Sequence, residues 1–362
     1  MNRIDAAIGR LEAARSALET SPARAVRLLG GLRAYPRALR GEAEFIRAEG
    51  LRGMGYFARA EESYGKALAG AQGDPPLFVE ALLASAAGLR SVGAVALARA
   101  RLASAAAAIL KASLPGYGAR LALEKALVER AGGRYAESIR LLRPMLRGAL
   151  GRGDLGEAAF LLWAVGGAER FRGRLKASEE AFLSSLSLAR RTGDGAAAGY
   201  ALFGLGGVTR ILGRLRDSER HYAAAAKAFQ GTEDVFGRAY AECGLANALR
   251  QQGRLAEAER LYRRAHALYS SLGDPLDLAY VDWGLGQVHL HRGELAKAEA
   301  RHRSALAAFR RGGETRGMVH ASMSLAQALH ASGRTLEAEA LFGRAYALAR
   351  SKGIHAHLEI YT

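Results

Sequence analysis

Glycine recurs at a fixed interval of 40 residues through most of this chain. The series, which holds without an insertion, is Gly93, Gly133, Gly173, Gly213, Gly253, Gly293 and Gly333. Gly55 begins a similar phrase two residues out of register. A period of about 20–50 residues is typical of stacked structural repeats. The interval therefore predicts an extended array of repeats rather than one compact core. A chain of 362 residues is in any case too long for a single ordinary core.

An acidic residue forms a second periodic mark, 21 residues after the glycine. The series is Asp154, Asp194, Asp234, Asp274 and Glu314. An acid at this position can cap the start of a helix. Between the two marks apolar residues recur at helical spacing, and we expect Ala258, Leu261 and Ala265 to be buried between helices. Each repeat is thus predicted to be helix A, a glycine turn, helix B and a capped loop.

Three stretches depart from the repeat. Pro144 falls inside an expected helix B and should kink or shorten it. The stretch 111–118 lacks the acidic cap, so the repeats before residue 120 are less regular. Ser21 and Pro22 open a second helix in the N-terminal segment. We predict capping helices over residues 1–40, the repeat array over 41–353, and an incomplete helix or cap over 354–362.

The repeat resembles the tetratricopeptide repeat family. Around Gly253 the matching small and aromatic positions are Leu245, Ala246, Leu249, Ala258, Tyr262 and Ala265, and the pattern recurs from roughly residue 40 to residue 350. The 40-residue period is similar to that of the long-helix members, such as kinesin light chains and bacterial Rap-type regulators. The resemblance implies an all-α, right-handed superhelical solenoid of about eight antiparallel helix pairs, with helix A lining the concave face.

Two columns of large side chains lie on the predicted helix A. Thirteen residues before the glycine stand Phe160, Tyr200, Tyr240, Tyr280 and His320, and ten residues before it stand Trp163, Phe203, Cys243, Trp283 and Met323. Residues three apart share a helix face. We expect the tyrosines to contact a ligand, because their hydroxyls need water or a partner, and the tryptophans to pack in the core.

Two polar columns continue the same face. Six residues before the glycine stand Gly167, Gly207, Asn247, Gln287 and Gln327, and three before it stand Arg90, Arg130, Arg170, Arg210 and Arg250, followed by Leu290 and His330. The predicted binding residues are Arg130, Arg170, Arg210, Arg250, Tyr200, Tyr240, Tyr280, Asn247, Gln287 and Gln327. Two structural explanations of the arginines remain open: the helix dipole, and pairing with the Glu179, Glu219, Glu259, Glu299 and Glu339 column of helix B.

Catalysis and cofactor binding are not indicated. Gly204-Leu-Gly206-Gly207 is like a phosphate-binding loop, but it falls inside a predicted helix with no strand before it. His289 and His291 are two apart and point in different directions on a helix, so we predict no metal site. Cys243 is the only cysteine. We therefore predict a non-enzyme without cofactor, in a reducing, cytoplasmic compartment and without a membrane span.

The charge balance points to an anionic partner. The formal net charge is +17, and only seven of the 52 basic residues are lysine. The favoured function is a scaffold or adaptor that holds an acidic or amphipathic peptide in its concave groove. Single-stranded nucleic acid, RNA in particular, is one alternative, with arginines on phosphates and tyrosines on bases. A self-associating assembly module is another, since the helix B that ends near residue 350 leaves Leu336, Leu341, Phe342, Tyr346 and Leu348 without a following pair to cover them.

Overall fold

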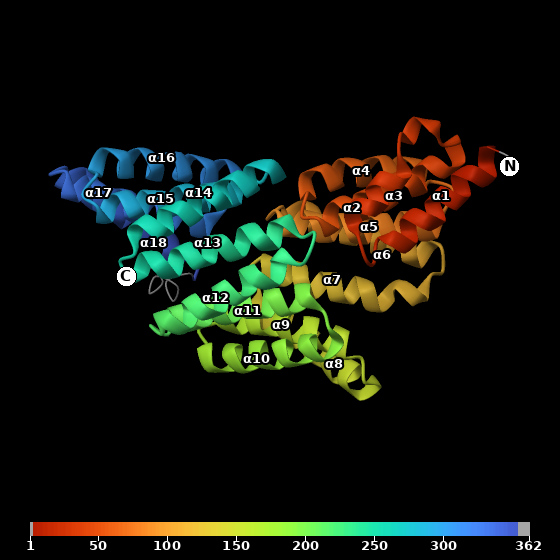
Figure 1. Cartoon of the computed structure of the whole chain (residues 1–362), viewed down its shortest axis with the longest axis horizontal. Coiled ribbons are helices and arrows are strands. Elements are labelled where there is room, and N and C mark those ends of the chain that lie inside the picture. Colours follow the sequence, from red (N-terminus) through yellow and green to blue (C-terminus); the bar gives the residue numbers. More distant parts are fainter. Residues whose placement is uncertain (1–2, 354–362) are drawn as a thin grey trace. The chain divides into compact units, whose positions relative to one another are not determined.

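The computed structural model describes residues 3–353, which form helices joined by short turns (Figure 1). This part of the chain contains eighteen α-helices, two short 3-10 helices and no strand. A first pair, α1 and α2, is followed by eight further pairs, from α3 and α4 to α17 and α18. The predicted all-α repeat solenoid is confirmed, whereas the right-handed turn of its superhelix stays a prediction. The predicted incomplete helix or cap at 354–362 lies outside the described residues.

The chain divides into two compact units, of which unit 1 comprises Met1–Glu157 and Gly231–Phe236. Ser21 begins the second helix as predicted, because its Oγ accepts from the Arg24 backbone N–H at 3.2 Å and Pro22 follows it. The helices are α1 (Arg3–Ala17), α2 (Pro22–Leu29), η1 (Leu32–Ala34), α3 (Arg37–Gly53), α4 (Phe57–Gly70), α5 (Pro75–Ser91), α6 (Val95–Lys111), η2 (Pro115–Tyr117), α7 (Gly118–Ala131) and α8 (Tyr135–Arg152). The pairing thus continues before residue 120.

Unit 2 comprises Ala158–Gln230 and Gly237–Thr362. Its odd-numbered helices are the predicted A helices and its even-numbered helices are the predicted B helices. They are α9 (Leu155–Phe171), α10 (Leu175–Thr192), α11 (Gly195–Ile211), α12 (Leu215–Gln230), α13 (Val235–Gln251), α14 (Leu255–Leu272), α15 (Pro275–His291), α16 (Leu295–Gly312), α17 (Thr315–Ala331) and α18 (Thr335–Ser351).

The two periodic marks end one helix and begin the next. Gly253 has φ of +77°, a left-handed conformation that glycine adopts without steric cost, and it lies two residues after Gln251, the last residue of the A helix α13. The acids then cap the A helices: the Asp194 side chain accepts from the Ala197 N–H at 2.9 Å, and Asp274 accepts from the Leu276 and Asp277 N–H groups at 3.0 Å each. The glycine conformation and these capping hydrogen bonds thus confirm the predicted repeat of helix A, turn, helix B and capped loop.

Glycines of the A helices receive the aromatic rings of the B helices. A Cβ at Gly206 would lie 2.8 Å from the Tyr222 ring, and one at Gly284 would lie 2.5 Å from the Tyr262 ring. The glycine-rich phrase beginning at Gly204 therefore lies inside helix α11, where its small residues allow close packing and no phosphate loop exists.

Two details of the helix B prediction are corrected. Ala258 and Ala265 are fully buried as expected, but Leu261 is only half-buried, because the buried seam of α14 runs through Tyr262 instead. Pro144 does not shorten its helix, since α8 continues through it to Arg152. A proline removes one backbone donor, and the remaining bonds of this long helix maintain it.

No helix within residues 3–353 is both long and apolar enough to cross a membrane.

Candidate functional site

The predicted columns of unit 2 lie on five successive A helices, α9, α11, α13, α15 and α17. We use "inner face" for the surface made by Tyr200, Tyr240, Tyr280, Asn247, Gln287, Gln327, Arg170, Arg210 and Arg250. The Arg316 guanidinium carbon, on α17, lies 4.8 Å from the ring centroid of Phe171, on α9. This contact joins A helices four pairs apart, so the five helices curve around the inner face. Arg130 is half-buried on α7, which belongs to unit 1, and its role in binding stays a prediction.

The three tyrosines of the inner face are half-buried. Tyr240 stacks on Phe203 with ring centroids 3.6 Å apart, and Tyr200 meets Phe229 edge-on at 4.9 Å. The Tyr280 hydroxyl donates to Glu314 Oε2 at 3.0 Å, and burial raises its pKa. Each ring is therefore anchored by packing, which fixes its orientation at low entropic cost to any ligand.

Of the polar column Asn247, Gln287 and Gln327, the first two form hydrogen bonds within the chain and the third is exposed to solvent. Asn247 Oδ1 accepts from the Tyr262 hydroxyl at 2.8 Å, and Gln287 is buried with its Nε2 donating to Ser324 Oγ. Gln327 is exposed. Only Gln327 thus offers a fully accessible amide, while the other two hold the neighbouring helices in place.

The arginines of the column have different surroundings. Arg90, in unit 1, forms an ion pair with Glu124 at 3.6 Å. In unit 2, Arg170 lies over the Phe171 ring at 4.8 Å and Arg250 over the Trp283 ring at 5.4 Å. A guanidinium stacked on an aromatic face keeps its charge and its hydrogen-bond donors.

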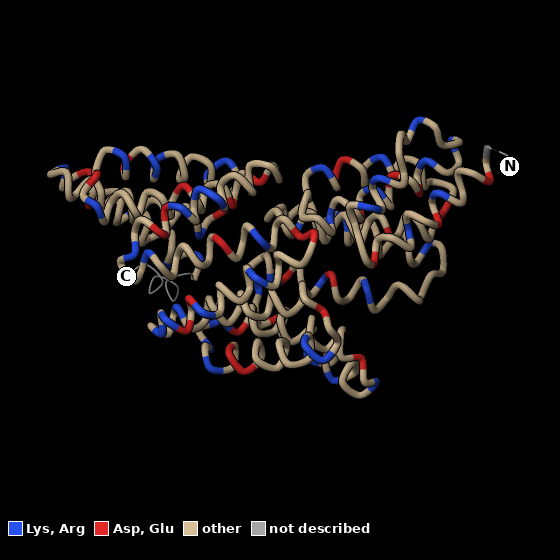
Figure 2. Tube along the Cα trace, in the orientation of Figure 1, with Lys and Arg blue, Asp and Glu red and all other residues tan. Residues whose placement is uncertain are grey.

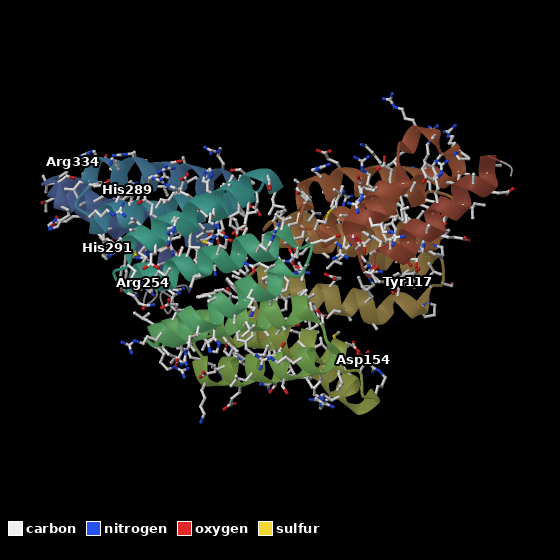
Figure 3. The ribbon with its side chains drawn as sticks, in the orientation of Figure 1. Tyr117, Asp154, Arg254, His289, His291 and Arg334 are labelled. Atoms are coloured by element: carbon white, nitrogen blue, oxygen red, sulfur yellow. The ribbon has the colours of Figure 1, made fainter. Side chains whose placement is uncertain are left out.

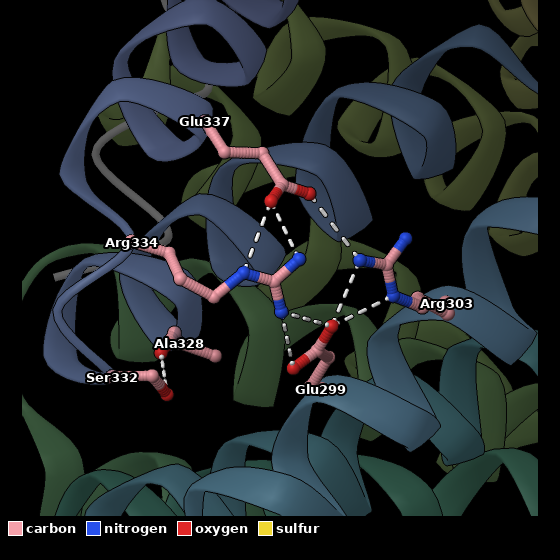
Figure 4. A network of polar contacts seen from close by, with 6 residues as sticks. All are labelled: Glu299, Arg303, Ala328, Ser332, Arg334 and Glu337. Atoms are coloured by element: carbon pink, nitrogen blue, oxygen red, sulfur yellow. Dashed lines mark hydrogen bonds and ion pairs between the residues drawn. The ribbon is translucent and has the colours of Figure 1, made fainter.

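The glutamate column does not pair with the inner arginines. Arg214 donates to Glu179 at 2.5 Å and Arg254 to Glu219 at 2.6 Å, so each glutamate binds the arginine that follows the next turn glycine. Arg334 and Glu299 repeat the contact at 2.9 Å (Figure 4), and Figure 3 labels Arg254 and Arg334. Pairing with helix B carboxylates, one of the two structural explanations for the inner arginines, is therefore wrong for these three glutamates. The helix dipole remains, since Arg170, Arg210 and Arg250 all lie in last turns.

Sequence reasoning missed two charged residues near the inner face, Asp277 and Arg316. Arg316 Nε donates to the Tyr280 hydroxyl at 3.4 Å. Burial raises the pKa of the Asp277 carboxyl well above its usual range, and the neighbouring Asp274 raises it further. Arg316 recurs in no other repeat of unit 2, and an acid in the column of Asp277 recurs only at Glu157, so a column comparison passes over both residues. For Arg316 the available signal was a charged residue in a column whose other members, Gly156, Ala196, Phe236 and Leu276, are small or apolar.

Trp283 and Cys243 are structural. Trp283 is buried, and its Nε1 donates to Ser324 Oγ at 2.9 Å, which confirms the expected core role. Burial raises the pKa of the Cys243 thiol to about 12, so it is no nucleophile at neutral pH.

His289 and His291, which Figure 3 labels, each contact another group of the chain. His289 Nδ1 lies 2.9 Å from Glu294 Oε2, and His291 Nδ1 lies 2.7 Å from the Gln287 carbonyl oxygen. Throughout residues 3–353 no three His, Cys, Asp or Glu side chains come together in a way that could hold a metal ion.

A shallow hollow of about 680 Å³ lies away from these columns, at the turn between α9 and α10. Its lining includes Arg174, Lys176 and Glu180, which are exposed turn and first-turn residues. It is too open to enclose a small molecule, so the inner face remains the candidate site.

Helix pairs closed by a glycine turn, with a ring of helix B set against small residues of helix A, define an α-solenoid of the tetratricopeptide type. The tetratricopeptide repeat family matches residues 198–271, 237–310 and 277–351. The resemblance seen in the sequence is confirmed over residues 198–351, which match this family. No curated protein matches the sequence.

Solved structures agree with this fold. A Rap protein complexed with Competence and Sporulation Factor is similar with a TM-score of 0.72 and 12% identity, covering 97% of this chain and 99% of that protein. The apo form of RapI is similar with a TM-score of 0.57 and 13% identity, covering 71% of this chain and 92% of that protein. At these identities the likeness establishes the helical repeat fold of the Rap proteins.

Proposed function

We propose that this protein is a non-catalytic scaffold whose inner face binds an acidic or amphipathic peptide segment of another protein. The observation that carries the proposal is the shared placement of Arg170, Arg210 and Arg250 on successive A helices, with aromatic rings beside them. Arginines supply charge-assisted bonds to carboxylates, and anchored rings supply apolar contact area. The Rap protein named above was solved with a bound factor, which supports ligand binding on this fold.

Charge over the whole molecule is consistent with an acidic partner. Figure 2 shows basic and acidic positions distributed along both units, with a formal excess of 17 positive charges in the sequence. Acidic side chains of the helix B column are already paired with the turn arginines. The arginines of the inner face are not used in that way, so they remain to attract an acidic ligand.

The test uses a peptide selected from a display library against the intact protein. Its affinity is then measured for the wild type and for a triple variant in which Arg170, Arg210 and Arg250 become glutamate. We expect binding to be abolished while circular dichroism shows the same helicity, because charge reversal turns attraction into repulsion. The matched control carries Arg214→Glu, Arg254→Glu and Arg334→Glu, which changes the net charge equally at the turns. Unchanged affinity in the inner triple variant would refute the proposal.

Binding of single-stranded nucleic acid, the alternative to peptide binding, is tested in a parallel experiment. Affinity for a single-stranded RNA oligonucleotide is measured across a salt series, because phosphate contacts give a steep decrease with salt. A steep slope that depends on the inner arginines, together with no selectable peptide, would replace the peptide proposal with RNA binding.

Self-association is a second candidate, favoured by the last helix pair. On α18 the side chains of Leu336, Phe342 and Tyr346 are 84%, 50% and 46% exposed. Exposed apolar side chains on one helix can form a contact between two copies. Light scattering over a concentration series, with Phe342→Glu as the variant, tests it, and a wild type that stays monomeric throughout would exclude it.

A further inference from the structure

Unit 1 carries exposed arginines around the short helix η1. The sequence between Glu19 and Glu42 contains no acidic residue. It contains five arginines, and all of them are exposed: Arg24, Arg27, Arg33, Arg37 and Arg40. Basic positions in this N-terminal part of the chain are visible in Figure 2. The segment thus presents positive charge to solvent with no acid inside it.

Contacts with η1 bring four arginines of unit 1 together. Arg40 Nε donates to the Tyr35 carbonyl oxygen at 2.9 Å, and its Nη2 donates to the Arg33 carbonyl oxygen at 3.4 Å. Arg37 is three residues before Arg40 and shares its face of α3. Arg10, on α1, lines a hollow of about 100 Å³ that also borders η1. We use "arginine patch" for Arg10, Arg33, Arg37 and Arg40.

Ion pairing within the chain does not account for the arginine patch. Across residues 3–353 no carboxylate oxygen lies within 4.0 Å of the four guanidinium groups. Glu42, the next acid along the chain, binds Arg15 at 2.6 Å instead. The bonds of Arg40 end on neutral carbonyl oxygens, which leave its charge uncompensated. This differs from the turn arginines of unit 2, such as Arg214 and Arg254, which bind glutamates.

The helix dipole does not account for the patch either. Arg37 and Arg40 lie in the first turn of α3, which contains no acidic residue. A cation is unfavourable at this end of a helix, because the dipole is positive there. The exposed pair Arg310 and Arg311, in contrast, lies in the last turn of α16, where the dipole favours a cation. Two of the patch arginines therefore lie where the fold alone disfavours them, and an external anion would compensate their charge.

The groups beside the arginines favour the phosphate backbone of a nucleic acid over other anionic partners. The other exposed residues of the segment 30–40 are small: Gly30, Gly31, Ala34 and Ala38. A peptide or a lipid surface is usually held by apolar side chains as well as by charge, and this segment exposes no large apolar side chain. Charge alone is sufficient for binding to phosphates, and guanidinium groups bind them in a bidentate way. Small residues between the arginines also allow a wide backbone to approach.

The patch has no group that would read or stack on an unpaired base. Tyr35 is the one aromatic residue of the segment 30–40, and it is 2% exposed, with its hydroxyl donating to the Leu29 carbonyl oxygen at 3.0 Å. Binding of single strands generally uses exposed rings for stacking. The segment also contains no Asn, Gln, Ser or Thr to contact base edges.

We propose that the arginine patch binds the phosphate backbone of a nucleic-acid duplex independently of its sequence. The patch belongs to unit 1, and the proposal does not depend on peptide binding at the inner face of unit 2. Its four guanidinium groups supply the charge-assisted bonds, and the exposed glycines and alanines leave room for the backbone between them.

The test measures the affinity of the full chain for a labelled DNA duplex of about 20 base pairs by fluorescence anisotropy, over a series of sodium chloride concentrations. Four phosphate contacts should give a slope of about −3.6 in a plot of log K against log salt. The double variant Arg33→Gln, Arg37→Gln should bind at least about tenfold more weakly and have a slope smaller by about two. Arg310→Gln with Arg311→Gln removes the same charge elsewhere and should bind as the wild type does. Circular dichroism verifies that both variants fold.

Two further probes test the class of partner. A duplex of unrelated sequence should bind equally well, and a single strand of the same length should bind no more tightly. Equal losses in the two double variants, or a loss confined to the inner triple variant, would overturn the proposal. So would a wild type that binds vesicles of phosphatidylserine and phosphatidylcholine through Arg33 and Arg37 but does not bind the duplex, because the patch would then be a membrane contact.

Discussion

The ring of Tyr262 on α14 lies so close to Gly284 on α15 that a Cβ there would be 2.5 Å from it. Both positions are helical and buried, so neither backbone can yield easily. We therefore expect Gly284→Ala to destabilise the protein by about 1–3 kcal/mol through overpacking. Chemical denaturation monitored by circular dichroism gives the free energy of unfolding.

Gly343→Ala is the control for this substitution. Gly343 lies inside α18, and a Cβ there would meet nothing within 4 Å. Alanine should then stabilise the helix by about 0.5–1 kcal/mol, because glycine is the poorer helix former. Equal effects of the two alanines would show that the close packing of Tyr262 against α15 does not control stability.

Much of the fold was predictable from the sequence because its determinants are local. A positive φ at Gly253 and a capping carboxylate at Asp274 each act within a few residues, and their fixed spacing determines the length of every helix. The contact between Phe171 and Arg316 was not predictable in this way. It depends on rotations accumulated over four helix pairs and on a residue that no other repeat shares.

The candidate site was predicted only in part. The columns are on the expected helices, but the partners of the glutamates were not foreseen. Glu219 binds Arg254 across 35 residues because the start of the next helix B lies beside it, whereas Arg250 belongs to the end of helix A. Sequence spacing gives the helix face of a side chain, and its partner depends on how neighbouring pairs pack.

His302 makes the stability of unit 2 dependent on pH. It is fully buried on α16, where sister repeats have Tyr262 or Phe182, and neither ring nitrogen has a partner among the described residues. Burial, and then the charges of Arg250 and His289, lower its pKa to about 3. The unfolded chain takes up this proton near pH 6.5, so stability is complete above that pH and decreases as the pH falls toward 3.

His302→Phe tests this dependence. We expect the wild type to lose up to about 4 kcal/mol more than the variant between pH 7 and pH 3, because the variant has no imidazole to protonate on unfolding. Urea unfolding at several pH values measures the difference, in which the carboxylates common to both proteins cancel. Parallel pH profiles for the two proteins would contradict the assigned pKa. A constant offset between them would report only the packing of the new ring.

The two leucines of α18 should respond differently to charge. Leu341 is only 8% exposed and packs with the core of the last pair, whereas Leu336 is 84% exposed. Leu341→Glu should therefore cost about 3 kcal/mol or more through a buried carboxylate, and Leu336→Glu should change stability by less than about 0.5 kcal/mol. Thermal unfolding of the two variants compares them directly. If Leu336→Glu were the more damaging, the exposed side of α18 would be wrongly assigned.

The outer ion pairs should contribute to stability in a salt-dependent way. Arg334 contacts Glu299 of the preceding pair and Glu337 of its own helix, and Arg303 joins the same network (Figure 4). All four side chains are partly exposed, so screening limits the gain. We expect Arg334→Gln to cost about 0.5–1 kcal/mol at low ionic strength and markedly less in 1 M sodium chloride. Arg344→Gln, on the same helix and in no ion pair among the described residues, is the control and should show neither the loss nor its salt dependence. A loss in Arg334→Gln that persists undiminished at high salt would mean that Arg334 acts through packing of its stem rather than through its charge.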